Sequence, residues 1–176
     1  MLNSYVSGRG YAGRMLACSH AYYLYPGSVT IFLHFRNEAV MKNILVIDAQ
    51  GGGMGKQLIS EIRKRQLDVH ITAVGTNSAA TAQLIKAGAD CGATGENPVI
   101  VNSKNADYIL GPIGIIAADS MLGEITPKMS KAVGKSSAKK ILIPVNSCGI
   151  YVAGVANQSV KINIENAVDH LEKELT

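Results

Sequence analysis

Aromatic side chains and cysteines are scarce in this sequence. It has no tryptophan, and aromatic residues make up 5% of its 176 residues. Single-stranded nucleic acid is bound by basic residues interleaved with aromatic ones, and no such stretch occurs after residue 40. Cys18, Cys91 and Cys148 lie too far apart for a metal knuckle or a paired disulfide framework. We therefore expect no metal site, and the cysteines are typical of a protein from the reducing cytoplasm.

Long apolar runs and dense charge are also missing. The longest early apolar stretch, residues 29–35, is far shorter than the ~20 residues needed to span a membrane. The net charge is +4, and the basic residues are dispersed. Their densest cluster, residues 63–65, ends a predicted helix, where cations favour the helix dipole. We expect neither a membrane nor a nucleic acid as partner.

Residues 1–40 differ in composition from the rest of the chain. They hold five of the seven tyrosines and both phenylalanines but no lysine. We expect them to be an extension upstream of a natural start at Met41, poorly packed or disordered, and residues 41–176 to form one domain. A secretory signal is the competing interpretation, although its apolar stretch is short and no Ala-x-Ala cleavage pattern follows it.

The stretch NILVIDAQGGGMGK, residues 43–56, organises the domain. A continuous apolar run over residues 44–47 predicts a strand buried on both faces, as in a parallel sheet. The glycines after Asp48 allow a tight turn and a close approach of the backbone to a ligand. Helical periodicity follows, and the free N–H groups of a helix N-terminus attract anions. We predict a site for the phosphates of a nucleotide here.

Neither of two well-known phosphate loops is matched in full. Gly51 and Gly53 fit the first two positions of G-x-G-x-x-G, but Lys56 stands at the third glycine. The G-x-x-x-x-G-K-[ST] loop fails at Gln50 and Gln57. The turn is therefore a degenerate anion site, and the alternative is that its glycines serve packing only.

A second strand is predicted over Val69–Val74, and its end would face the ribose of a dinucleotide. An acidic residue there would indicate NAD, whereas this chain has Thr76 and Asn77 after Gly75. Neutral donors also tolerate the 2′-phosphate of NADP, although no arginine lies nearby to favour it. Helix capping by Thr76 or Asn77 is the alternative interpretation.

A further buried strand, Asp107–Leu110, runs into the turn Gly111–Gly114. In a doubly wound sheet the strand beside the first one marks the switch point where ligands bind. The turn is thus expected to form the opposite wall of the site, or else is an ordinary strand-to-helix turn. The predicted cofactor-binding residues are Asp48, Gln50, Gly51, Gly52, Gly53, Met54, Gly55, Thr76, Asn77, Gly111, Pro112 and Gly114.

Catalytic residues cannot be assigned from the pattern. Ile115–Leu122 is a helix candidate, and the nearby Asp119 and Glu124 are five residues apart, so they do not share a helix face. We expect no acid–base pair and no metal site from them. Cys148 lies where strands end and is a conceivable nucleophile, but no histidine stands in an obvious partner position. Whether the protein is an enzyme stays open.

The predicted architecture is α/β: a Rossmann-like three-layer sandwich with a parallel sheet in the order 3-2-1-4-5. An antiparallel edge strand over Ile150–Val155 would complete the sheet, and an amphipathic helix would end the chain.

Four segments resemble a known family. They are IDAQGGGMGK, VGTNSAATAQLIKAGAD, GATGENPVIVNSKNADYILGPIGII, and MLGEITPKMSKAVG followed by KILIPVN. Together they resemble a small uncharacterised family, a domain of unknown function with a Rossmann-like, nucleotide-binding look, from about Met41 to Thr176. This resemblance supports the fold and assigns no chemistry.

Two functions fit the sequence. The first is binding of a nucleotide cofactor such as NAD(P) through residues 51–55. The second is a regulatory or sensor module that binds a phosphorylated metabolite or nucleotide without turnover. Either is compatible with a homo-oligomer.

Overall fold

The computed structural model describes residues 41–145, 150–155 and 158–176. The prediction for residues 1–40 and the candidate nucleophile Cys148 lie outside this part of the chain. Within it, no helix is both long and apolar enough to cross a membrane.

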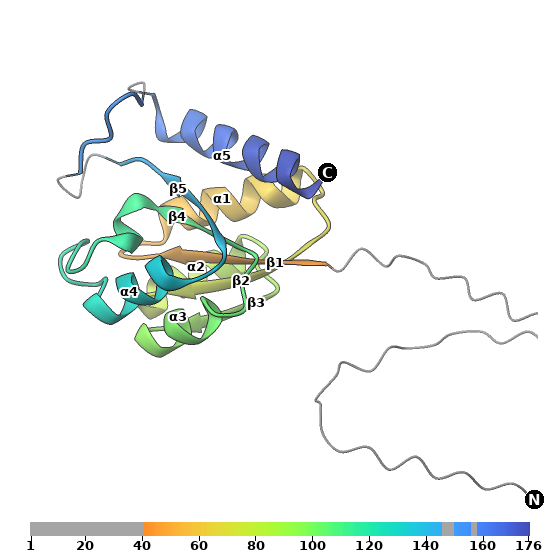
Figure 1. Cartoon of the computed structure of the whole chain (residues 1–176). Coiled ribbons are helices and arrows are strands. Elements are labelled where there is room, and N and C mark those ends of the chain that lie inside the picture. Colours follow the sequence, from red (N-terminus) through yellow and green to blue (C-terminus); the bar gives the residue numbers. More distant parts are fainter. Residues whose placement is uncertain (1–40, 146–149, 156–157) are drawn as a thin grey trace, which may run out of the picture. The chain divides into compact units, whose positions relative to one another are not determined.

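Five parallel strands form the sheet, in the order β3-β2-β1-β4-β5. This order confirms the prediction, and Figure 1 shows β1 in the middle of the sheet. The strands are β1 (Lys42–Asp48), β2 (Val69–Gly75), β3 (Cys91–Thr94), β4 (Tyr108–Pro112) and β5 (Lys139–Ile143).

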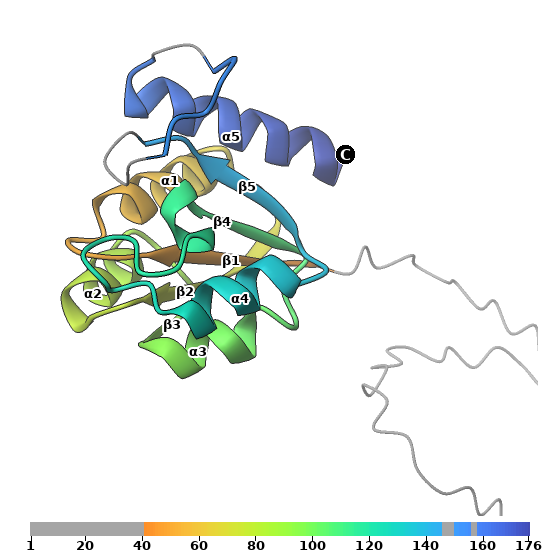
Figure 2. The same cartoon turned by 60° about the vertical axis from the view of Figure 1, so that its left-hand side comes forward.

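Helices cover both faces of the sheet. Figure 2 shows α1 and α5 on one side of it and α3 and α4 on the other. The buried Leu84 of α2 joins the core formed with α1 and α5. The helices are α1 (Gly53–Lys64), α2 (Ser78–Lys86), α3 (Glu96–Asn102), the 3₁₀ turn η1 (Ile113–Ile116), α4 (Pro127–Lys135) and α5 (Val160–Leu175).

The sheet has a hydrophobic core on each of its two faces, and strand β1 contributes side chains to both. Ile44 and Val46 pack with α1 and α5, while Leu45 and Ile47 face the core beneath α3 and α4. All four side chains are at most 1% exposed. The continuous apolar run therefore reflects burial on both faces, as parallel sheets require.

The predicted antiparallel edge strand is wrong. Residues 150–155 form no strand, and the described sheet is entirely parallel. Gly154 has φ +83° within a turn, and the Tyr151 side chain is 85% exposed. The chain turns at residues 153–154 and therefore does not continue the sheet edge.

The predicted helix over Ile115–Leu122 is also wrong. Only the single turn η1 forms, and the chain then passes through a loop, residues 117–126, before α4. Asp119, Met121 and Leu122 have positive φ values of 60°, 54° and 60°. Left-handed residues cannot continue a right-handed helix.

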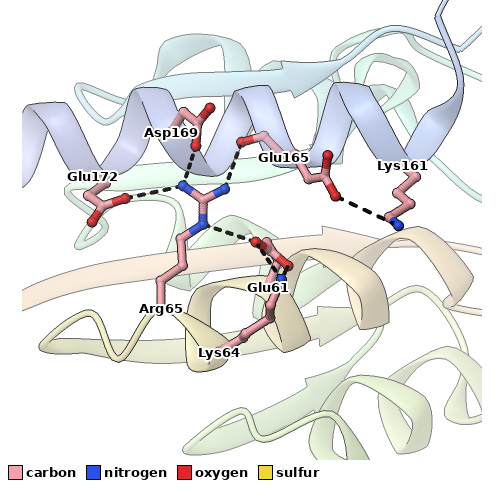
Figure 3. Close-up of polar contacts among 7 residues, drawn as sticks. All are labelled: Glu61, Lys64, Arg65, Lys161, Glu165, Asp169 and Glu172. Atoms are coloured by element: carbon pink, nitrogen blue, oxygen red, sulfur yellow. Dashed lines mark hydrogen bonds and ion pairs between the residues drawn. The ribbon is translucent and has the colours of Figure 1, made fainter.

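An arginine just after α1 joins this helix to α5 (Figure 3). The Arg65 Nε donates to Glu61 at 3.0 Å, and its Nη1 contacts Glu172 at 3.1 Å and Asp169. Its Nη2 donates to the Glu165 carbonyl at 3.4 Å. This side chain thus connects segments about a hundred residues apart.

Candidate functional site

The candidate site lies where β1 and β2 end and their following loops meet. Both loops lie at the same edge because the two strands are parallel. The Thr76 N–H donates to the Asp48 carbonyl at 3.0 Å, and the Asn77 side chain donates to the Gln50 carbonyl at 2.9 Å. The structure therefore brings together the first two segments predicted for the site.

Asp48 caps α1 from inside the protein. Its Oδ1 accepts the Ala49 N–H at 2.8 Å, and its Oδ2 accepts the Gly55 N–H at 2.6 Å. The residue is only 4% exposed. Burial raises the pKa of this carboxyl, although the N–H groups of Gly55, Ala49 and Met54 oppose that rise.

The expectation of unpaired amides at the start of α1 is therefore wrong for Gly55. The Asp48 carboxyl group accepts the Gly55 N–H and so neutralises part of the positive partial charge at the N-terminus of α1. Met54 is half-buried and packs against the core with its side chain. Any external anion must bind nearer the solvent, at the loop before the helix.

Two of the four loop glycines are required by packing. Gly52 has φ +67°, and a Cβ there would lie 2.8 Å from the Ala80 Cα. A Cβ on Gly55 would lie 2.4 Å from the Leu84 Cδ2 and 3.0 Å from the Asp48 Cβ. For these two positions the packing interpretation suffices.

The other two loop glycines, Gly51 and Gly53, face open space. A Cβ at either position would meet nothing within 4 Å, and neither residue has a left-handed φ. Their N–H groups have no hydrogen-bond partner among residues 41–145, 150–155 and 158–176. Glycine lowers stability relative to alanine where its freedom is not needed, so the described fold gives no reason for glycine here.

A carboxylate that the sequence did not assign to the site lies beside this loop. The Oε2 of Glu124 accepts the Gln50 N–H at 2.9 Å and the Asn77 Nδ2 at 3.0 Å, and it also accepts the Thr76 hydroxyl. The bond from Thr76, followed by that from Gln50, lowers the pKa of Glu124 below its usual range. Glu124 is therefore ionised at neutral pH and can only accept hydrogen bonds.

Asn77 has both roles that the sequence left open. Its Oδ1 accepts the Ala80 N–H at 2.9 Å and caps α2, while its Nδ2 points towards Gln50 and Glu124. Thr76 does not cap the helix, and its hydroxyl is directed to Glu124. Helix capping thus explains the role of the Asn77 Oδ1 but not that of its Nδ2, and it does not explain the position of Thr76.

The third predicted segment lies differently from the expectation. Gly111 and Pro112 belong to β4, and both are buried with Gly114. A Cβ on Gly111 would lie 2.3 Å from the Ile47 carbonyl oxygen. The protein itself fills the space that a ligand was expected to occupy beside Gly111.

Sequence reasoning missed Glu124 because it was judged by its distance from Asp119 along an expected helix. Its position depends on a loop that returns to residues 74 positions away. The signal available in the sequence was the lack of an acid after β2, which left a place for a carboxylate from elsewhere. In the described part of the chain, no group of histidine, cysteine and acidic residues has the arrangement of a metal site.

The family match agrees with this architecture. The family described as "Domain of unknown function (DUF3842)" matches residues 43–176. The chain belongs to this family. The resemblance seen in the sequence is thereby confirmed, and the DUF3842 match runs from the second residue of β1 to the end of α5. No curated protein matches the chain.

Two solved structures show distant similarity to this DUF3842 protein. One is a dodecameric FMN-dependent UbiX-like decarboxylase from Escherichia coli O157:H7, with 18% identity and a TM-score of 0.37; the match covers 75% of this chain and 77% of that one. The other is glutamyl-tRNA reductase from Methanopyrus kandleri, with 14% identity and a TM-score of 0.39. That match covers 77% of this chain but only 36% of the reductase.

Proposed function

We propose that this DUF3842 protein binds a nucleotide cofactor such as NAD(P) at the carboxyl ends of β1 and β2. The observation that carries the proposal is the pair Gly51 and Gly53, with open space in front of both and no described partner for their amides. Backbone amides in a glycine turn are suited to phosphate oxygens.

The position of the loop supports the same assignment. It follows the central strand, beside the point where the chain order reverses between β1 and β4. Ligands of open α/β sheets bind at such switch points. The exposed Lys56, in the first turns of α1, is a cation close to the loop in sequence and carries no described ion pair.

The two carboxyl groups limit where a phosphate can lie. Asp48 is buried beneath the loop, and Glu124 accepts hydrogen bonds from the Gln50 N–H at the start of the loop and from the side chains of Thr76 and Asn77. Phosphates would therefore lie over Gly51 and Gly53, away from Glu124. A sugar, which donates hydrogen bonds, suits the neighbourhood of Glu124 better than a phosphate does.

Thermal unfolding with NAD, NADP, ATP and sugar phosphates tests the proposal. A ligand at 100 times its Kd adds about 2.7 kcal/mol of stability, which corresponds to roughly 10 °C for a domain of this size. The substitution Gly53→Asp adds a carboxylate beside the amides of Gly51 and Gly53, and it should abolish this shift.

Two controls separate charge from shape. Gly53→Asn has nearly the same shape without the charge, and Gly134→Asp places the same charge in open space on α4. We expect Gly134→Asp to keep the full shift and Gly53→Asn to keep part of it. A shift that survives Gly53→Asp unchanged would place the anion elsewhere and refute the proposal.

The second candidate, a sensor module that binds a phosphorylated metabolite or nucleotide, uses the same site. It is favoured by the residues that the structure describes around the loop, which include no acid–base pair: Asp48 is buried, and Glu124 is held by three donors. Sedimentation velocity with and without the stabilising ligand, together with assays of redox turnover, distinguishes the two. Ligand-dependent association without turnover indicates the sensor.

A further inference from the structure

Glu124 is presented by a strained and exposed loop. Asp119, Met121 and Leu122 all have positive φ, which is unfavourable for residues other than glycine. The Leu122 side chain is 96% exposed, so burial of the loop's tip does not offset this strain. Strained backbone of this kind is typical of functional sites.

Several hydrogen bonds hold the loop in this conformation. The Asp119 N–H donates to the Ile125 carbonyl at 2.8 Å, and the Ser120 hydroxyl donates to the Gly114 carbonyl at 2.6 Å. Ile125 is buried at 1% exposure and anchors the return of the loop. Glu124 therefore stands between a fixed backbone and the donors of the site.

The two oxygens of the Glu124 carboxylate have different surroundings. Oε2 accepts all three bonds, from Gln50, Thr76 and Asn77. Oε1 accepts none from the residues that the structure describes. One oxygen thus fixes the position of the group, and the other is free to accept a hydrogen bond from a bound molecule.

The place of this carboxylate in the fold is informative. Thr76 and Asn77 directly follow Gly75, the last residue of β2. In dinucleotide sites an acid from this position accepts the ribose 2′-hydroxyl. The sequence lacks an acid there, and Glu124 brings one to the same position from 47 residues further along the chain.

We infer that Glu124 binds the ribose hydroxyls of the nucleotide and selects cofactors with a free 2′-hydroxyl, such as NAD, against those with a 2′-phosphate, such as NADP. This inference rests on the proposed function. A hydroxyl donates to Oε1, whereas a 2′-phosphate brings a dianion against an ionised carboxylate, with no arginine in the β2–α2 loop to compensate.

Isothermal titration with paired ligands tests the inference. The pairs are NAD with NADP, and AMP with 2′,5′-ADP, which differ only in the 2′-phosphate. We expect the wild type to bind the member with the free hydroxyl at least tenfold more tightly in both pairs. In Glu124→Gln the amide oxygen can keep the three donors while its NH₂ faces the ligand, so the preference should fall about tenfold or reverse.

Two further variants control for loss of structure. Glu124→Asp keeps the charge and should keep the preference, even where overall affinity falls. Glu172→Gln removes a carboxylate near the C-terminal end of α5, where it pairs with Arg65, and should leave both affinities unchanged. Thermal unfolding without ligand verifies that each variant is folded.

Three results would overturn the inference in distinguishable ways. If no nucleotide binds the wild type, the proposed function fails, and the inference fails with it. Equal binding of both members of a pair by the wild type refutes the selectivity while the proposed function stands. If Glu124→Gln weakens both members equally at an unchanged ratio, Glu124 only ties the loops together.

Discussion

Alanine substitutions at neighbouring glycines of the β1–α1 loop should have opposite effects on stability. Gly52 has φ +67° and lies against the backbone of α2, where an added Cβ would be 2.8 Å from the Ala80 Cα. Gly53 is the first residue of α1, and an added Cβ there would meet nothing within 4 Å. The two positions differ in backbone conformation and in the space around them.

The expected magnitudes follow from these two differences. For Gly52→Ala the left-handed conformation costs about 1–2 kcal/mol, and overpacking against backbone that cannot move away adds about 1–3 kcal/mol. The sum, about 2–5 kcal/mol, is a large part of the roughly 5–15 kcal/mol that stabilises a typical domain. Gly53→Ala should instead gain about 0.4–1 kcal/mol, because alanine restricts the unfolded chain at no steric cost.

Urea unfolding followed by circular dichroism measures both effects. With slopes of about 1–3 kcal/mol per molar urea, Gly52→Ala should lower the midpoint by roughly 1 M or more, and Gly53→Ala should leave it equal or slightly higher. Gly55→Ala should lie between them, because the contact at 2.4 Å is with the end of the Leu84 side chain rather than with backbone. If Gly53→Ala lowered stability as much as Gly52→Ala, the distinction between glycines required by packing and glycines that face open space would be refuted.

Three further outcomes are expected. Arg65→Met should lower stability by roughly 1–2 kcal/mol in denaturant titration, as a network of partly exposed ion pairs allows. Arg65 lowers the pKa of Glu61. The wild type should therefore have the full stabilisation above the ordinary pKa of a glutamate and lose it as pH falls through the lowered pKa of Glu61. Arg65→Met should not show this loss of stability at low pH. Burial raises the pKa of Asp48, so this carboxyl group binds a proton more readily in the folded protein than in the unfolded chain. The free energy of unfolding should therefore decline as pH rises from the ordinary pKa of an aspartate through the raised pKa. Unfolding of Asp48→Asn, measured at several pH values, should lack this decline. Gly111→Ala should unfold at markedly lower urea or fail to accumulate as folded protein, because its Cβ would lie 2.3 Å from the Ile47 carbonyl oxygen, and a wild-type midpoint would contradict the filled space there.

The sequence predicted the strand order because each parallel strand carries a local signal. The apolar run ending at Asp48 and the later run ending near Pro112 mark strands buried on both faces, and glycines mark the turns. The error over Ile150–Val155 arose because a short apolar run does not reveal whether a sheet edge is available. The error over Ile115–Leu122 arose because positive φ at non-glycine residues has no signature in composition.

The sequence predicted only those parts of the candidate site that directly follow a strand in the chain. Residues 50–55 and 76–77 were placed correctly at one edge because parallel strands bring their ends together. The cap supplied by Asp48 could not be foreseen, since it depends on how the turn directs individual N–H groups. Glu124 could not be foreseen either, because its contact with Gln50 joins residues far apart in the chain.

Because β1 is buried on both faces, its register in the sheet is fixed by the polar residues at its ends rather than by its apolar side chains. A slip by one residue would exchange Ile44 and Val46 with Leu45 and Ile47 between two equally dry interiors, so hydrophobicity alone would not penalise the error. Asp48, bonded to amides beyond the strand, would be pulled away from them by such a slip. The carboxyl group that closes part of the helix end to ligands therefore also fixes how the central strand is threaded between its neighbours.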